Sequence, residues 1–290
     1  MPADYHMHLI HDTHEDKCPY TLERIAAYLQ VAEKNGVQEI GITEHCHRFT
    51  AFRPVMAHLL EGDNTYDAVT EWLSKQFYEP LDEYVEVLVK AQQRGWPVKI
   101  GLEVDYIPGQ EDAIREILAP YPWDYTLGSV HYIDTWGIDI SPQSGWPDRD
   151  IDEAYRTYFQ LLQQAAQSGL FDSLAHPDLI KKFGHRPAYD LEPVYAQTAA
   201  IVAKAGCAIE VSTAGLHRPV AETYPNEALL KHFRTAGVPI TLGSDAHRPE
   251  DVGRDFPVAV ELCHKTGYRT FTCFTRRAPE QRPLGRDLEG

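Results

Sequence analysis

Six segments of the chain repeat one pattern, in which an amphipathic stretch ends at a glycine and an apolar run follows within a few residues. Glycine is favoured just past a helix end because it readily adopts the left-handed backbone conformation. The apolar runs are rich in Ile, Val, Leu and Thr without strict alternation, which is typical of parallel strands buried on both faces. The segments are residues 35–43, 94–104, 168–176, 205–212, 236–245 and 266–274.

Apolar residues at helical spacing lie between these runs. Such spacing predicts amphipathic helices that bury one face. Two clear stripes are Leu22, Ile25, Ala26, Leu29 and Ala32, and then Leu81, Tyr84, Val85, Leu88 and Ala91. With further strands predicted around Tyr5 and before His131, roughly seven or eight strands alternate with helices. This alternation favours right-handed βαβ units that close into an α/β barrel.

The chain has no linker or low-complexity tract, so we expect a single domain over residues 1–290. Two long insertions, residues 48–79 and 133–150, follow predicted strand ends, and we expect them over the C-terminal face of the barrel. The Pro-, Arg- and Gly-rich tail after Arg276 predicts frayed chain. Aromatic residues of the insertions could cover a site or be core residues under long loops: Phe49, Phe52, Trp72, Tyr78, Trp136 and Trp146.

Composition excludes several classes of protein. The 290 residues include 27 Lys and Arg against 43 Asp and Glu, a net charge of −16, which disfavours binding to nucleic acid or an anionic membrane. No apolar run reaches the roughly 18 residues of a membrane span, and the opening segment does not resemble a secretion signal. The five cysteines include no CxxC pair, so we expect reduced thiols in the cytoplasm.

The chain has 14 histidines, and many of them fall at predicted strand ends. His6 and His8 are two residues apart in one strand, so both imidazoles lie on one face. The other strand ends carry His45, Glu103, His131, His176, and the pair Asp245 and His247. A lone histidine is more often structural than a metal ligand. Barrels of this kind build their active site at the C-terminal strand ends, however, so the whole pattern predicts a metal site.

These motifs resemble, in order and spacing, the PHP (polymerase and histidinol phosphatase) family of metal-dependent phosphoesterases. The resemblance covers nearly the whole chain and implies a distorted (β/α)7 barrel, TIM-like and of the PHP type. Residues 128–137, 176–183 and 210–216 look most like the histidinol-phosphate phosphatase branch. The motifs are His6-Met7-His8, Thr43-Glu44-His45, Gly101-Leu102-Glu103, Ser129-Val130-His131, Ala175-His176-Pro177 and Gly243-Ser244-Asp245-Ala246-His247.

The resemblance implies a trinuclear centre of divalent metal ions. The first ion would be held by His6, His8, Glu103 and Asp245. The second would be held by Glu103, His131 and His176, with Glu103 shared, and the third by His14, His45 and His247. His14 lies in the first loop, where strand ends alone do not reveal it. Mixed imidazole and carboxylate ligands suit Zn, Fe or Mn rather than Mg alone, and the sequence does not choose among the three.

The resemblance also implies a phosphatase of histidine biosynthesis that hydrolyses L-histidinol phosphate. We hypothesise that a hydroxide bridging the first two ions attacks phosphorus in line, because metal coordination lowers the pKa of water from about 15.7 towards 7. Glu103, Asp245 and His247 are the catalytic candidates. Candidate contacts for the substrate's phosphate are Lys181, Lys182, Arg186, His217, Arg218 and Arg254.

Other functions stay open from the sequence. A PHP phosphoesterase acting on a different small phosphorylated metabolite is the main alternative. A PHP nuclease should show a basic track, which this acidic chain lacks. A metal-binding protein without turnover should have closed coordination shells and no anion-binding residues. A homo-oligomer is compatible with the sequence, which does not decide the oligomeric state.

Overall fold

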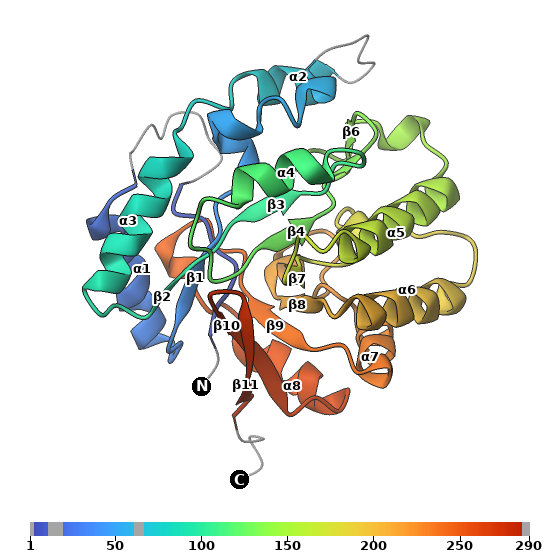
Figure 1. The fold of residues 1–290 in the computed structure, drawn as a ribbon. Helices are drawn as coiled ribbons and strands as arrows, with labels where there is room; N and C mark the ends of the chain where they lie inside the picture. Colours follow the sequence, from blue (N-terminus) through green and yellow to red (C-terminus); the bar gives the residue numbers. More distant parts are fainter. Residues whose placement is uncertain (1–2, 11–19, 61–66, 286–290) are drawn as a thin grey trace.

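A ring of parallel strands forms the centre of the computed structural model, which describes residues 3–10, 20–60 and 67–285 (Figure 1). Five strands pair in chain order as one parallel sheet: β3 (Glu103–Asp105), β4 (Leu127–Ser129), β7 (Ser173–Leu174), β8 (Ala208–Ser212) and β9 (Ile240–Gly243). The strand β2 (Val98–Ile100) leads into β3 after a two-residue break and pairs with β1 (Ile40–Ile42).

The N-terminal segment closes the ring between β1 and β9. Asp4 forms a parallel bridge with Ile40 on one side, and Met7 forms one with Ala246 on the other. The described part of the chain therefore contains seven parallel segments, counting β2 and β3 as one. The predicted distorted seven-stranded α/β barrel is confirmed.

Helices cover the outside of the barrel (Figure 1). All five apolar positions of the stripe predicted for residues 81–91 are buried, and the helices ending before Gly206 and Gly237 stop at left-handed glycines, with φ of 73° and 77°. None of the helices in the described ranges is long and apolar enough to cross a membrane. Their bounds are α1 (Leu22–Lys34), α2 (Asp67–Ser74), α3 (Leu81–Gln93), α4 (Glu111–Leu118), α5 (Ile151–Gln167), α6 (Glu192–Ala205), α7 (Glu227–Ala236) and α8 (Phe256–Lys265).

The last apolar run does not join the parallel ring, which corrects the sequence-based expectation. The strand β10 (Thr270–Thr275) pairs antiparallel with β11 (Ala278–Pro283), so the tail after Arg276 is ordered strand up to Pro283. The two turn residues, Arg276 and Arg277, have φ of 48° and 63°. Such two-residue turns are usually built from Asn and Gly, so an Arg-Arg turn gave no hairpin signal.

The two insertions contain short elements, and most of their aromatic side chains belong to the core. The first insertion contains α2, and the second includes the turn between β5 (Tyr132–Ile133) and β6 (Trp136–Gly137). Tyr78 is 42% exposed. The buried aromatic side chains are Phe49, Phe52, Trp136 and Trp146. Trp72, like Tyr78, is not among the buried residues: it is partly buried and lines a cavity beside the predicted site.

Gly41 on β1 leaves room for a tyrosine that spans the inside of the barrel. The Tyr125 hydroxyl donates to the backbone oxygen of Tyr5 at 2.6 Å, and a Cβ at residue 41 would lie 1.9 Å from that hydroxyl oxygen. Gly41→Ala should therefore lower the free energy of unfolding by about 1–3 kcal/mol, as overpacked cores do. Urea denaturation measures the change. A variant as stable as the wild type would mean that Tyr125 can shift without cost.

Candidate metal centre and active site

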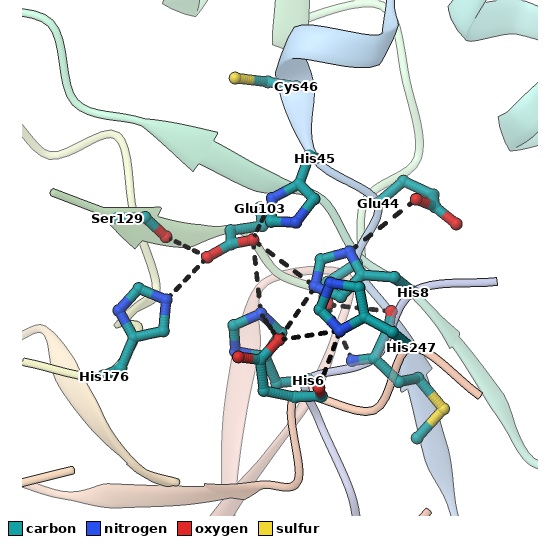
Figure 2. A network of polar contacts seen from close by, with 12 residues as sticks. His6, His8, Glu44, His45, Cys46, Glu103, Ser129, His176 and His247 are labelled. Atoms are coloured by element: carbon teal, nitrogen blue, oxygen red, sulfur yellow. Dashed lines mark hydrogen bonds and ion pairs between the residues drawn. The ribbon is translucent and has the colours of Figure 1, made fainter. Parts of the chain in front are cut away.

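Side chains that can bind metal converge at the C-terminal ends of the strands (Figure 2). The N-terminal segment carries His6 and His8, and Glu103 begins β3 instead of following the end of one long strand. The loops after β1, β4, β7 and β9 carry the rest: His45, His131, His176, Asp245 and His247. The structure thus brings together eight of the nine predicted ligands. The ninth, His14, lies outside the described residues.

Glu103 lies at the centre of this cluster and is 1% exposed. Its Oε2 atom is 2.7 Å from Nδ1 of His45 and 3.4 Å from Nε2 of His6, and its Oε1 atom is 3.0 Å from Nε2 of His176. Burial raises the pKa of Glu103, but the charges of His6, His45 and His131 outweigh it and hold this pKa well below its usual range. The carboxylate therefore stays ionised and can serve as a shared ligand.

Three groups of side chains have ligand atoms close enough to hold one metal ion each. Within each group the ligand atoms lie within 4.8 Å of one another. The groups are His6, His8 and Glu103; Glu103, His131 and His176; and His8, His45 and His247.

Unpartnered atoms at this centre fit bound metal ions. Among the described residues, Nε2 of His6 and Nε2 of His8 are buried without a hydrogen-bond partner. Polar atoms are costly to bury unpaired, and a divalent ion would satisfy both nitrogen atoms. The side chains present therefore suit a centre of several ions with mixed imidazole and carboxylate ligands.

Asp245 adds a second carboxylate to the first group. Its Oδ1 atom lies 3.3 Å from Nε2 of His8 and 3.6 Å from Nε2 of His6. Burial raises the pKa of Asp245, but the charges of His6, His247 and His8 hold it well below its usual range. Its backbone φ of 54° is uncommon for a residue other than glycine, and such strain clusters at functional sites.

A buried carboxylate that sequence reasoning missed supports His131. The Oδ1 atom of Asp105 accepts from Nδ1 of His131 at 2.7 Å, and its Oδ2 atom accepts from Sγ of Cys46 at 3.3 Å. Asp105 stands two residues after Glu103 in β3, and this spacing puts both side chains on one face of the strand. That spacing was the signal that could have revealed it.

Glu44, next to the predicted ligand His45, has a structural role in the same cluster. Its Oε1 atom accepts from the backbone nitrogen atoms of Leu9 at 2.6 Å and Ile10 at 3.1 Å. Its Oε2 atom lies 3.8 Å from Nδ1 of His8. Glu44 therefore fixes the chain just after His8 and places a negative charge behind that imidazole.

Metal-free protein should lose stability as the pH rises, because of the pair of His131 and Asp105. Burial lowers the pKa of His131, but the charge of Asp105, their hydrogen bond and the charge of Glu103 raise it to about 10. An imidazole whose pKa is about 6.5 in the unfolded chain then stabilises the fold fully below pH 6.5. That contribution, a few kcal/mol at most, is lost as the pH rises through about 10.

Urea denaturation of chelator-treated protein at pH 7 and pH 10 measures this loss. His131→Gln removes the titrating group and should show a smaller fall in unfolding free energy over the same interval. Equal falls in the two proteins would contradict the assignment.

A cavity of about 390 Å³ opens onto the cluster. Its wall includes five of the predicted metal ligands: His45, His131, His176, Asp245 and His247. Four of the six predicted phosphate contacts also line it: Lys182, His217, Arg218 and Arg254. Arg248, Asp139 and Tyr224 line it without having been predicted. Several cations on one wall suit an anionic ligand such as a phosphate.

The structure places the other two predicted contacts, Lys181 and Arg186, away from this wall. Lys181 is 2% exposed, and its Nζ atom lies 2.7 Å from Oδ2 of Asp178 and 3.1 Å from Oε2 of Glu222. Arg186 pairs on the surface with the same Glu222 at 2.8 Å. Both cations are therefore held by carboxylates that neighbour each other in space, while Lys182 turns towards the cavity.

A second cavity, of about 330 Å³, adjoins the first. The two share five residues in their walls: His45, His131, Asp139, Lys182 and Arg218. The second has a more apolar lining, including Trp72 and Tyr132, and the Trp72 ring lies 4.7 Å from that of His47. The first cavity, with its charged wall beside the metal-competent cluster, thus continues into a second cavity with aromatic residues in its wall.

Comparison with known proteins agrees with this geometry. A model of the PHP-domain family matches residues 5–214. The chain is 37% identical over 265 residues to the probable histidinol-phosphatase of Deinococcus radiodurans, which covers 89% of this chain and 94% of that protein. It is 25% identical over 280 residues to the histidinol-phosphatase of Bacillus subtilis, covering 86% of this chain and 97% of that protein.

Solved structures share the fold. The crystal structure of histidinol phosphate phosphatase from Lactococcus lactis, in complex with zinc, L-histidinol and phosphate, matches with a TM-score of 0.71 and 22% identity. The match covers 96% of this chain and 98% of that one. The putative histidinol phosphatase of Listeria monocytogenes matches with a TM-score of 0.70 and 22% identity, over 88% of this chain and 99% of that one.

Proposed function

The chain belongs to the PHP-domain family, and from this membership we propose that it is a metal-dependent phosphatase that hydrolyses L-histidinol phosphate to L-histidinol and phosphate. The observation that carries the proposal is Glu103, an ionised buried carboxylate shared by two groups of histidines beside a cavity with cationic walls. The relatives named histidinol-phosphatase align with nearly the whole chain, which supports the same substrate.

The proposed centre holds three divalent ions. We assign His6, His8, Glu103 and Asp245 to the first ion and Glu103, His131 and His176 to the second. We assign His14, His45 and His247 to the third, with His8 also within reach of it. Zn, Fe and Mn all suit these ligands. Bound there, the ions would supply Lewis-acid catalysis, by polarising the phosphoryl group and making water more acidic.

The cations of the cavity wall bind the phosphate in this proposal. Neighbouring carboxylates orient two of them, because Arg254 pairs with Asp251 at 2.6 Å and Lys182 pairs with Asp139 at 3.0 Å. Arg218 is exposed on the same wall. Charge-assisted bonds from such groups are among the stronger hydrogen bonds. They would neutralise the negative charge on the phosphoryl oxygens as phosphorus is attacked.

The adjoining cavity is our candidate for the imidazole and amine of the substrate. Trp72 and Tyr132 offer aromatic faces to a planar cationic ring, and Asp139 offers a carboxylate at the junction of the two cavities. The insertions at residues 48–79 and 133–150 supply Trp72 and Asp139. We propose that both insertions belong to the single barrel domain and cover the substrate.

Phosphate release from L-histidinol phosphate by the purified protein is the direct test, with metal content measured by elemental analysis. A panel of other small phosphomonoesters tests the main alternative, which is a phosphoesterase acting on a different small phosphorylated metabolite. A much higher kcat/KM on another member of the panel would replace L-histidinol phosphate as the substrate. A metal-loaded protein that releases phosphate from none of them is not a phosphatase of this class.

Arg218→Ala should raise KM for L-histidinol phosphate by about 10–100-fold, because a hydrogen bond to a charged group contributes about 1.5–3 kcal/mol. The metal content should not change, since Arg218 belongs to none of the metal-competent groups. Arg186→Ala is the matched control, because Arg186 lies on the surface and pairs with Glu222. Steady-state kinetics compares the two variants. An equal effect of both would remove Arg218 from the phosphate site.

A further inference from the structure

Glu210 is a buried carboxylate that the proposed catalytic scheme does not use. It lies on β8, the strand of the five-stranded sheet that adds no member to the metal-competent groups of the described residues. The side chain is 1% exposed, and among the described residues no Lys or Arg forms an ion pair with it. An ionised carboxylate is costly to bury unless hydrogen bonds or charges compensate it, so its contacts need a physical explanation.

Each oxygen of Glu210 accepts from a different metal-competent histidine. Oε1 lies 2.9 Å from Nδ1 of His6, and Oε2 accepts from the backbone nitrogen of His176 at 2.7 Å. His6 belongs to one group around Glu103, and His176 belongs to another. One carboxylate from a strand without ligands therefore contacts both groups.

The contact with His6 determines which ring nitrogen faces the other ligands. A carboxylate accepts and does not donate, so Nδ1 of His6 must carry the proton. In the neutral imidazole, Nε2 then keeps its lone pair, and it points towards Oε2 of Glu103 at 3.4 Å and Oδ1 of Asp245 at 3.6 Å. Carboxylates behind ligating histidines fix the tautomer and raise the basicity of the ligand in this way.

The contact with His176 supports a strained backbone. His176 has a φ of 27°, which lies in the left-handed region that side-chain-bearing residues rarely adopt. Its backbone N–H is directed at Oε2 of Glu210. This hydrogen bond offsets part of the strain and helps to hold the imidazole where it meets Glu103.

Gly243 on β9 makes the space that the carboxylate occupies. A Cβ at residue 243 would lie 1.9 Å from Oε1 of Glu210 and 2.7 Å from Cβ of His6. Its φ is not positive, so the structure needs glycine here for room and not for backbone conformation. Gly243, the carboxylate of Glu210 and the imidazole of His6 are thus packed against one another beside the proposed metal centre.

We propose that Glu210 is a positioning residue that orients His6 and His176 for the metal centre, with Gly243 providing its space. The role rests on the proposed function, since it concerns the same centre. Losing a carboxylate behind a ligating histidine typically weakens metal binding 10–100-fold. Glutamine cannot replace Glu210, because it has one acceptor oxygen where two donors, His6 and His176, need two.

Zinc binding to the metal-depleted full chain tests the proposal without using catalysis. Glu210→Gln should bind Zn²⁺ about 10–100-fold more weakly than the wild type, in competition with a chelating indicator. Its Co²⁺-loaded form should also show shifted visible absorption bands. Asp124→Asn is the matched control: Asp124 is a buried carboxylate that accepts from the backbone nitrogens of Ile100 and Arg276 at the opposite end of the barrel. It should bind zinc like the wild type.

Gly243→Ala keeps the carboxylate, but the new Cβ would clash with both Oε1 of Glu210 and Cβ of His6, so it should also weaken zinc binding. If Glu210→Gln does not fold, Glu210→Ala provides the test, because truncating residue 210 removes both acceptor oxygens without adding an atom. It should also bind zinc about 10–100-fold more weakly than the wild type. Zinc affinity within twofold of the wild type in the folded Glu210 variants would overturn the positioning role. Failure of the wild type to release phosphate from L-histidinol phosphate would instead overturn the proposed function.

Discussion

Glu103→Gln should strongly reduce both metal loading and phosphatase activity. Glu103 is the residue shared by two of the metal-competent groups, and its two oxygens contact His45 at 2.7 Å and His176 at 3.0 Å. An amide keeps the shape but removes the negative charge and one acceptor oxygen. Mutating a residue that only hydrogen-bonds to a metal ligand typically lowers metal affinity or activity by about 10–100-fold. Because Glu103 is itself a proposed ligand, we expect kcat/KM to fall by more than about 100-fold.

Elemental analysis should show that the Glu103→Gln protein retains less metal per chain than the wild type. Glu39→Gln is the control, because Glu39 is a partly buried glutamate that accepts from Tyr5 and pairs with Lys99 away from the centre. The control should keep both metal and activity. A Glu103→Gln protein with full metal content and normal turnover would exclude Glu103 as a ligand and would remove the main support for the proposed mechanism.

Removal of metal should inactivate the protein and lower its thermal stability. The buried imidazole nitrogen atoms without hydrogen-bond partners are compensated when ions are bound, and ions that bind only the folded chain stabilise it by mass action. At a free metal concentration 1,000-fold above the dissociation constant, this amounts to about 4 kcal/mol per ion. Phosphate release and the thermal midpoint should both fall after dialysis against a chelator.

Adding back Zn²⁺, Mn²⁺ or Fe²⁺ one at a time should restore both properties, and the metal that restores the highest kcat identifies the preferred ion. His8→Ala serves as a second probe, because His8 takes part in two of the metal-competent groups. It should reduce the recovery on re-addition. Turnover that survives complete removal of metal would exclude metal-assisted hydrolysis.

Much of the barrel could be predicted because its signals are local. The stripe on α3 places Leu81, Tyr84 and Leu88 on one face, and each is buried as its helical spacing requires. The hairpin of β10 and β11 shows where local signals fail. Its turn residues, Arg276 and Arg277, adopt positive φ without the glycine or asparagine that marks such turns.

The metal-competent residues could also be predicted in large part. Parallel strands end at the same edge of the barrel, so a metal-binding side chain at each strand end suffices to bring them together. Pairing among ligands was harder to predict: His8 also lies with His45 and His247, although its motif assigns it to the first ion. Such groupings depend on how neighbouring strands are staggered, which the sequence does not encode locally.

By itself, the sequence determined the alternation of strands and helices and the residues at the strand ends, because periodicity and strand direction are properties of short segments. Only the tertiary structure decided the partners of the buried charges. Lys181 is turned away from the cavity by Asp178 and Glu222, while Lys182, the next residue, faces it. Glu210 meets an imidazole 204 residues earlier in the chain. The physical reason is that the free energy of a buried charge depends on which distant groups the fold brings within hydrogen-bonding distance.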